Sequence, residues 1–151
     1  MATNEVAKKT VDVTQLAKYT KKIREIGTIN KMMAPTYLQD FIEAMDVSST
    51  MLSAAIHADL KAESALKTAE SIAYLDRAGA ILQAKGIKES ADARKMCLAI
   101  DPDVVKAKDE KARTEALVCF LKNKVQEFRS AHDDVRKFAY GDAYMTPHEG
   151  M

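Results

Sequence analysis

Residues 36–84 read TYLQDFIEAMDVSSTMLSAAIHADLKAESALKTAESIAYLDRAGAILQA, and this stretch decides the fold. Its apolar residues recur at spacings of three, four and seven from Leu38 to Ala73, which is the period of one helix face. The predicted helix ends near Ala84, just before Gly86, because glycine commonly follows a helix. The stretch therefore predicts one long helix, with a weak point at residues 47–50 (VSST) at which the helix could bend or break. A continuous helix and a broken one both stay open there.

A second long helix is predicted to begin at Asp101-Pro102, an N-cap followed by proline at the first helical position. It runs to about Ala139 and stops at Gly141. Its apolar side is the candidate surface for contacts between copies of the chain. That surface comprises Leu117, Leu121, Val125, Phe128, Val135 and Phe138.

Two shorter helices complete the prediction. The first covers residues 13–26, with a capping box that begins at Asp12, and Gly27 is expected at its C′ position. The second covers residues 91–99, with Ser90 as its N-cap. Gly79, near the end of the first long helix, is expected to mark close packing.

Composition supports an all-helical chain. Only 5 glycines, 3 prolines and 6% aromatic residues occur among 151 residues, which disfavours an all-β sandwich or barrel. A helix over residues 36–84 would span roughly 73 Å, whereas a compact chain of this size has a diameter of about 40 Å. We therefore expect an all-α, elongated hairpin of long helices with a short amino-terminal helix and a short connecting helix. The apolar residues that it leaves uncovered suggest a homo-oligomer.

Charge divides the chain into three predicted regions. Residues 1–35 form a basic segment with one helix. This segment contains seven Lys or Arg residues and three acidic residues. Residues 36–140 form the helical hairpin, and residues 36–70 of it hold six acids and two bases. Residues 141–151 are predicted to be an irregular tail. The formal net charge of +1 excludes a uniformly basic or acidic protein.

The basic residues are candidates for binding nucleic-acid phosphates, with Tyr19 available to stack on an unpaired base. Two other interpretations stay open: a solvated helix face, and docking of the segment on the acidic first half of the long helix. The leading candidates are Lys18, Lys21, Lys22 and Arg24, and the secondary candidates are Lys61 and Lys67.

Catalytic and metal-binding patterns are not found in the sequence. It holds no GxSxG, P-loop, GxGxxG or HExxH motif. Its three histidines, His57, His132 and His148, lack metal-ligand spacing. Cys97 and Cys119 have apolar neighbours in the sequence and are expected to be small core residues. We therefore expect no enzyme activity, no catalytic residues, no metal and no cofactor.

Targeting signals are also not found. No run of apolar residues approaches the roughly 18 that a membrane-spanning helix needs, and residues 1–9 lack the apolar core of a signal peptide. The expected location is the cytoplasm, without membrane contact, and the host cytoplasm if a phage encodes the chain.

About residues 60–138, roughly half of the chain, resemble bacteriophage recombination mediators of the UvsY type. The features are Ala73-Tyr74-Leu75 late in a long helix, the turn at residues 86–90 (GIKES), a short helix, and residues 101–104 (DPDV) opening a long helix. The resemblance implies a small, helical, ring-forming and non-enzymatic protein that binds single-stranded DNA. Its partners would be a recombinase and a single-strand-binding protein.

Family members carry DNA-binding basic residues in the long central helix, where this sequence offers Lys61 and Lys67. The expected function is therefore that of a mediator that assists recombinase loading as a homo-oligomer. Two alternatives remain: a phage structural or assembly protein with protein contacts only, and a small inhibitor of a host protein.

Overall fold

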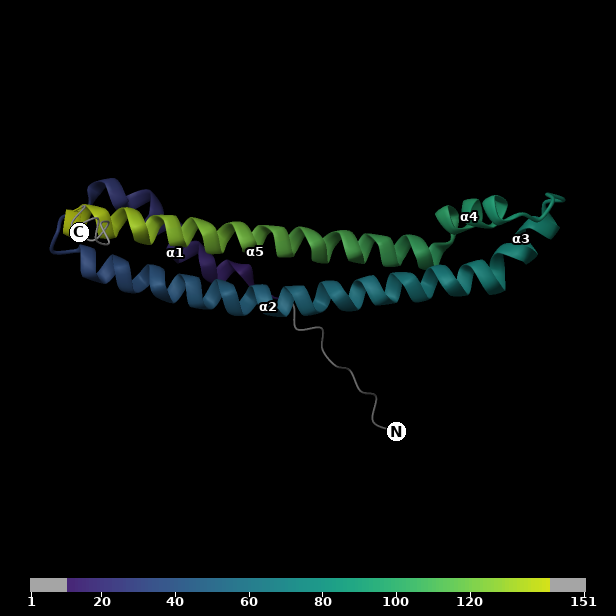
Figure 1. Ribbon diagram of the computed structural model, residues 1–151, viewed down its shortest axis with the longest axis horizontal. Coiled ribbons are helices and arrows are strands. Elements are labelled where there is room, and N and C mark those ends of the chain that lie inside the picture. Colours follow the sequence, from purple (N-terminus) through teal and green to yellow (C-terminus); the bar gives the residue numbers. More distant parts are fainter. Residues whose placement is uncertain (1–10, 142–151) are drawn as a thin grey trace, which may run out of the picture. The chain divides into compact units, whose positions relative to one another are not determined.

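The computed structural model describes residues 11–141, and every regular element among them is helical, which confirms the all-α prediction (Figure 1). The two longest elements, α2 and α5, have 39 residues each. In chain order the elements are the 3-10 turn η1 (Val13–Leu16), α1 (Ala17–Glu25), the 3-10 turn η2 (Ile26–Thr28), α2 (Ala34–Ile72), the π-helical turn η3 (Ala73–Arg77), α3 (Ala78–Ala84), α4 (Ala91–Ile100) and α5 (Pro102–Tyr140).

These helices build two compact units. Unit 1 combines the chain up to Ala54 with the stretch that begins at Phe120, and unit 2 runs from Ala55 to Cys119. Parts of α2 and α5 therefore belong to each unit, and the predicted boundary at residue 35 does not coincide with a boundary between units. The first ten residues, and the predicted tail beyond Gly141, lie outside the described residues.

Unit 1 has a core of aromatic and branched side chains. Phe41 of α2 and Phe128 of α5 are fully buried. The Tyr19 ring of α1 meets the Phe128 ring edge-on, with centroids 6.0 Å apart, and Tyr37 meets Phe41 in the same way at 6.3 Å. Edge-to-face contact is favourable because the positive edge of one ring faces the negative face of the other. Further buried members are Leu16, Ile29, Ala34, Ala44, Leu121, Ala131 and Val135.

Unit 2 is packed mostly through small side chains. Its buried apolar residues are Ala55, Ala62, Ala73, Ala78, Leu82, Cys97 and Val104. A polar contact joins α2 to α5: Asp59 accepts from the Lys111 ammonium at 2.8 Å and from the Thr114 hydroxyl at 2.7 Å. These hydrogen bonds lower the pKa of the Asp59 carboxyl. Small core residues leave many larger apolar side chains of unit 2 in contact with solvent.

A buried carboxylate holds η3 to the start of α5. Arg77 donates from Nε to Oδ2 of Asp101 at 2.7 Å and from Nη2 to Oδ1 at 2.8 Å. Oδ1 also accepts from the backbone N–H groups of Asp103 and Val104, as an N-cap does. The Arg77 guanidinium, and then these backbone bonds, hold the pKa of Asp101 below its ordinary value.

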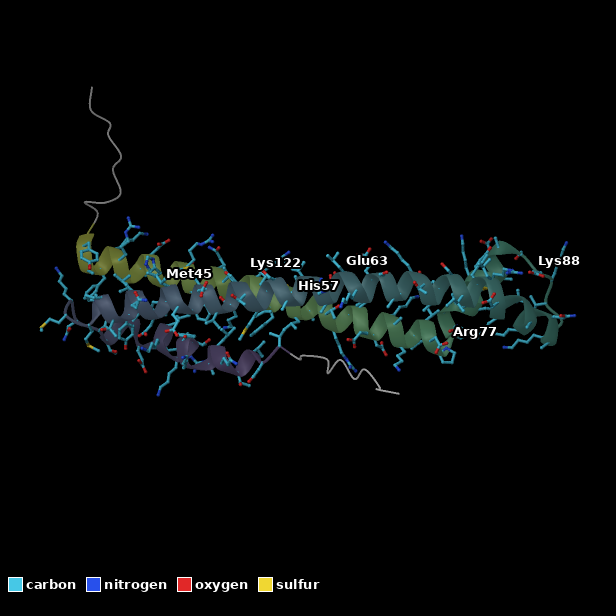
Figure 2. The ribbon with its side chains drawn as sticks, turned by 90° about the horizontal axis from the view of Figure 1, so that it is seen from below. Met45, His57, Glu63, Arg77, Lys88 and Lys122 are labelled. Carbon is cyan, nitrogen blue, oxygen red and sulfur yellow. The ribbon has the colours of Figure 1, made fainter. Side chains whose placement is uncertain are left out.

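The helix boundaries predicted at Gly86, Ser90 and Pro102 are confirmed, whereas the helix predicted over residues 13–26 is divided into η1, α1 and η2. The Ser90 hydroxyl accepts from the Ala93 N–H at 3.1 Å, and α5 begins at Pro102. Gly86 has a φ of 66°, and its neighbour Ile87 donates to the Leu82 carbonyl, the bonding pattern that closes a helix at a left-handed glycine. Lys88 lies in the irregular segment between this turn and α4 (Figure 2).

Three local expectations have different outcomes. Of the alternatives left open at residues 47–50, the structure has the continuous helix: α2 runs through them, and the Ser48 and Thr50 hydroxyls donate to backbone carbonyls one turn earlier. The irregularity occurs instead at η3. Gly27 lies in η2 without a positive φ, so it is not the predicted left-handed cap. Gly79 does mark close packing, because a Cβ there would lie 3.2 Å from Nη2 of Arg94.

Candidate nucleic-acid interface

The amphipathic pattern of α1 determines which of its basic side chains face solvent. Leu16 and Tyr19 are buried, and Ile23 and Ile26 are half-buried, at spacings of three, four and three. One helix face is thereby held against unit 1. Lys18, Lys21 and Arg24 lie on the exposed side.

Two polar contacts attach α1 and its flank to α2. The Lys22 ammonium forms an ion pair with the Asp40 carboxylate and lies 5.3 Å from the centroid of the Tyr37 ring. The Tyr37 hydroxyl donates to Glu25 at 2.9 Å, and this bond raises the pKa of the Tyr37 phenol. Docking on the acidic first half of the long helix, one of the three interpretations of the basic segment, is thus confirmed for Lys22.

A groove of unit 1, called here the basic-aromatic groove, lies where η1 and α1 face α5. Three of its eight lining residues are cationic and none is acidic. Lys21 and Arg24 come from α1, and Lys124 comes from α5. The remaining lining residues are Val13, Leu16, Ala17, Thr20 and Phe120.

Phe120 gives this groove an accessible aromatic ring. The side chain is 40% exposed, and the Lys124 ammonium lies 5.7 Å from the ring centroid. Lys124 also forms an ion pair with Glu127 at 2.7 Å, so Lys21 and Arg24 are the two groove cations for which no ion pair is found among residues 11–141. An exposed ring beside cations is suited to a ligand that is both flat and anionic.

The six residues predicted to bind nucleic acid do not form one site in the structure. Only Lys21 and Arg24 line the basic-aromatic groove. The Lys18 ammonium lies 4.6 Å from the Tyr19 ring centroid, and Tyr19 raises the pKa of Lys18. The two secondary candidates belong to unit 2, where Lys61 is exposed and Lys67 pairs with Glu63 at 3.0 Å.

Phe120 and Lys124 were not predicted from the sequence. Their spacing of four residues places them on one face of α5, and this spacing is the one signal that they carry in the sequence. The same helix has many such pairs, for example Val118 and Lys122. The contact of α5 with α1 is what distinguishes Phe120 and Lys124 from the other pairs of this spacing.

The predicted contact surface between copies needs correction. Leu121, Phe128 and Val135 are fully buried within a single chain, because α1 and the first part of α2 cover this side of α5. They therefore offer no surface to a second copy. Leu117 and Val125 are half-buried, and Phe138 is 46% exposed.

The two cysteines differ in their exposure to solvent. Cys97 is buried, as expected, whereas Cys119 is exposed, so its predicted place in the core is wrong. Residues 11–141 contain no cluster of three potential metal ligands. Over the same residues, no helix combines the length and the apolar character required to cross a bilayer.

No protein-family model matches the chain, and comparisons with curated proteins and with solved structures find no similar protein.

Proposed function

We propose that this chain is a non-enzymatic protein that binds single-stranded DNA through the basic-aromatic groove and acts as a homo-oligomer. The observation that supports this proposal is the composition of the groove, in which Lys21, Arg24 and Lys124 surround the exposed ring of Phe120 without an acidic lining residue. Phosphates would pair with the cations, and an unpaired base would stack on the ring.

The groove favours a single strand over a duplex. A base can stack on Phe120 only if its face is free, and duplex bases are already stacked on their neighbours. Two cations without an ion pair give weak binding for each subunit, which agrees with the formal net charge of +1. Several subunits on one strand would raise the overall affinity through effective concentration.

The role in recombination rests on the resemblance of about residues 60–138 to UvsY-type mediators. In that role the oligomer would hold a single strand while a recombinase replaces a single-strand-binding protein. The groove supports the proposal of DNA binding, and the resemblance alone supports the proposal of recombinase loading. A direct test of DNA binding therefore comes first.

Fluorescence anisotropy with a labelled oligothymidine at 50 and 200 mM salt tests the proposal. We expect binding whose affinity falls with salt. The double variant K21A/R24A removes two phosphate contacts and should reduce the slope of log K against log salt by about 1.4. Phe120→Ala should weaken binding roughly 5- to 150-fold, the range that corresponds to about 1–3 kcal/mol for a stacked base.

Matched control variants can be made on α5 at positions that do not line the groove. Phe138→Ala removes a ring that is similarly exposed, and K106A/K108A removes two exposed lysines of unit 2. Both should bind like the unaltered protein. Absence of binding at 50 mM salt, or equal losses in groove and control variants, would refute the groove as a DNA site and would favour a protein with protein contacts only.

A further inference from the structure

Unit 2 leaves a large apolar side chain of the turn η3 exposed. Leu75 is 71% exposed. It lines a groove, called here the Leu75 groove, formed by the end of α2, η3 and α4. The other lining residues are Lys67, Glu70, Ser71, Tyr74, Lys95 and Leu98.

The π-helical turn carries two of the side chains that line this groove, Tyr74 and Leu75. In η3 the Ala78 N–H bonds to the carbonyl of Ala73, five residues earlier, so the turn contains one more residue than an α-helical turn. The extra residue changes which side chains lie on each face of the helix after Ile72. Arg94 holds this arrangement from α4 by donating from Nη1 to the Tyr74 carbonyl at 2.6 Å.

Cationic and anionic side chains lie beside the apolar residues of the Leu75 groove. Lys67 is paired with Glu63 within the chain. For Lys95 and Glu70, no ion pair is found within residues 11–141. The groove thus offers one unpaired cation and one unpaired anion around Leu75, Tyr74 and Leu98.

We propose that the Leu75 groove binds the same groove of a second copy of this chain about a two-fold axis. In such a contact residue i of one copy meets residue j of the other, and j meets i. Leu75 would pack on Tyr74 and Leu98 of the second copy, and each Lys95 would face Glu70 of the other. This inference rests on the homo-oligomer part of the proposed function and is independent of the basic-aromatic groove.

Charge complementarity favours a second copy as the occupant. A surface with one unpaired cation and one unpaired anion is complementary to itself when turned by 180°, so a single two-fold contact satisfies four charges. A polyanion would satisfy Lys95 and be repelled by Glu70. The contact also lies in unit 2, where Leu75 is exposed, rather than on the α5 residues that unit 1 buries.

A charge exchange measured by light scattering after size exclusion tests the inference. The unaltered protein should have a mass above the 16.7 kDa of one chain at tens of micromolar. Glu70→Lys and Lys95→Glu each place like charges opposite each other, so each variant alone should shift towards single chains. An equimolar mixture of the two should regain the larger mass, because both cross-pairs are then attractive, and so should the double variant E70K/K95E.

Leu75→Ser should also lower the mass, whereas Leu60→Ser should not, since Leu60 is 59% exposed on α2 but lies outside the groove. Circular dichroism shows whether each variant keeps its helices. A single-chain mass for the unaltered protein would overturn the inference and leave the groove to a different protein. Charge variants that do not recover on mixing would overturn it as well.

The two proposals fail in distinguishable ways. K21A/R24A should lose DNA affinity and keep the larger mass. Glu70→Lys should lose the larger mass while its separate subunits still bind a short oligonucleotide that spans one groove. If the mass is that of one chain but the short oligonucleotide binds, the contact between copies is refuted and the DNA site stands.

Discussion

Replacing Phe128 with alanine should destabilise unit 1 far more than the same change at Phe138. Phe128 is fully buried and its ring meets Tyr19 edge-on, whereas Phe138 on the same helix is 46% exposed. Truncation of a buried phenylalanine costs about 3–5 kcal/mol, and the lost ring pair accounts for about 0.5–1.5 kcal/mol of it. Truncation at Phe138 should change the free energy of unfolding by less than about 0.5 kcal/mol.

Urea titration followed by circular dichroism at 222 nm measures this difference at a single protein concentration. With a slope near 2 kcal/mol per molar urea, Phe128→Ala should lower the midpoint by roughly 1.5–2.5 M. Tyr19→Leu, Phe128→Leu and the double variant form a cycle. This cycle should give a coupling of about 0.5–1.5 kcal/mol between the rings.

Two results would refute this reasoning. Equal costs for Phe128→Ala and Phe138→Ala would show that the core of unit 1 does not contain Phe128. A cost that disappears on dilution would place Phe128 between copies, where the sequence pattern predicted it.

Two further predictions concern backbone conformation and acid stability. Gly86→Ala should lower the free energy of unfolding by about 1–2 kcal/mol, because φ is 66° at this residue. Gly27→Ala should be neutral or slightly stabilising, because Gly27 has no positive φ and has free space around it. Thermal unfolding of the two variants tests this difference. The pKa values of Asp101 and Asp59 are lowered from 3.8 by their partners, so the stability that they provide is present above about pH 4 and is lost as the pH falls further. Urea midpoints between pH 7 and pH 3 should fall as this stability is lost. Asp101→Asn should reduce this dependence on pH, whereas the exposed control Asp109→Asn should not. An equal dependence on pH in both variants would show that groups other than Asp101 cause the acid sensitivity.

Much of the fold followed from short-range signals. Ser90, the Asp101-Pro102 pair and Gly86 act on backbone groups within a few residues of themselves, so their effects are independent of the rest of the chain. The long apolar repeat predicted a helix over residues 36–84 for the same reason, but it gave no signal for the π-helical turn η3 that follows α2. Residues 47–50 left a continuous and a broken helix open, because a serine hydroxyl either ends a helix or bonds back into it, and local sequence does not distinguish the two.

The candidate site could be predicted only in part. The basic character of α1 is visible in the sequence, but Lys21 and Arg24 look the same there as Lys18 and Lys22. Tertiary contacts distinguish them: Asp40 pairs with Lys22, and α5 brings Phe120 and Lys124 beside the other two. Residues about one hundred positions apart leave no common pattern in a single sequence.

By itself the sequence determined that the described chain is helical and where most helices begin and end, because capping and periodicity are properties of neighbouring residues. The tertiary structure decided which apolar side chains are covered. α5 has apolar residues on more than one side, and their burial depends on where α1 and α2 pack. Phe128 therefore lies in the core of unit 1 while Leu75 remains exposed in unit 2, a difference set by packing partners and not by the hydrophobicity of either residue.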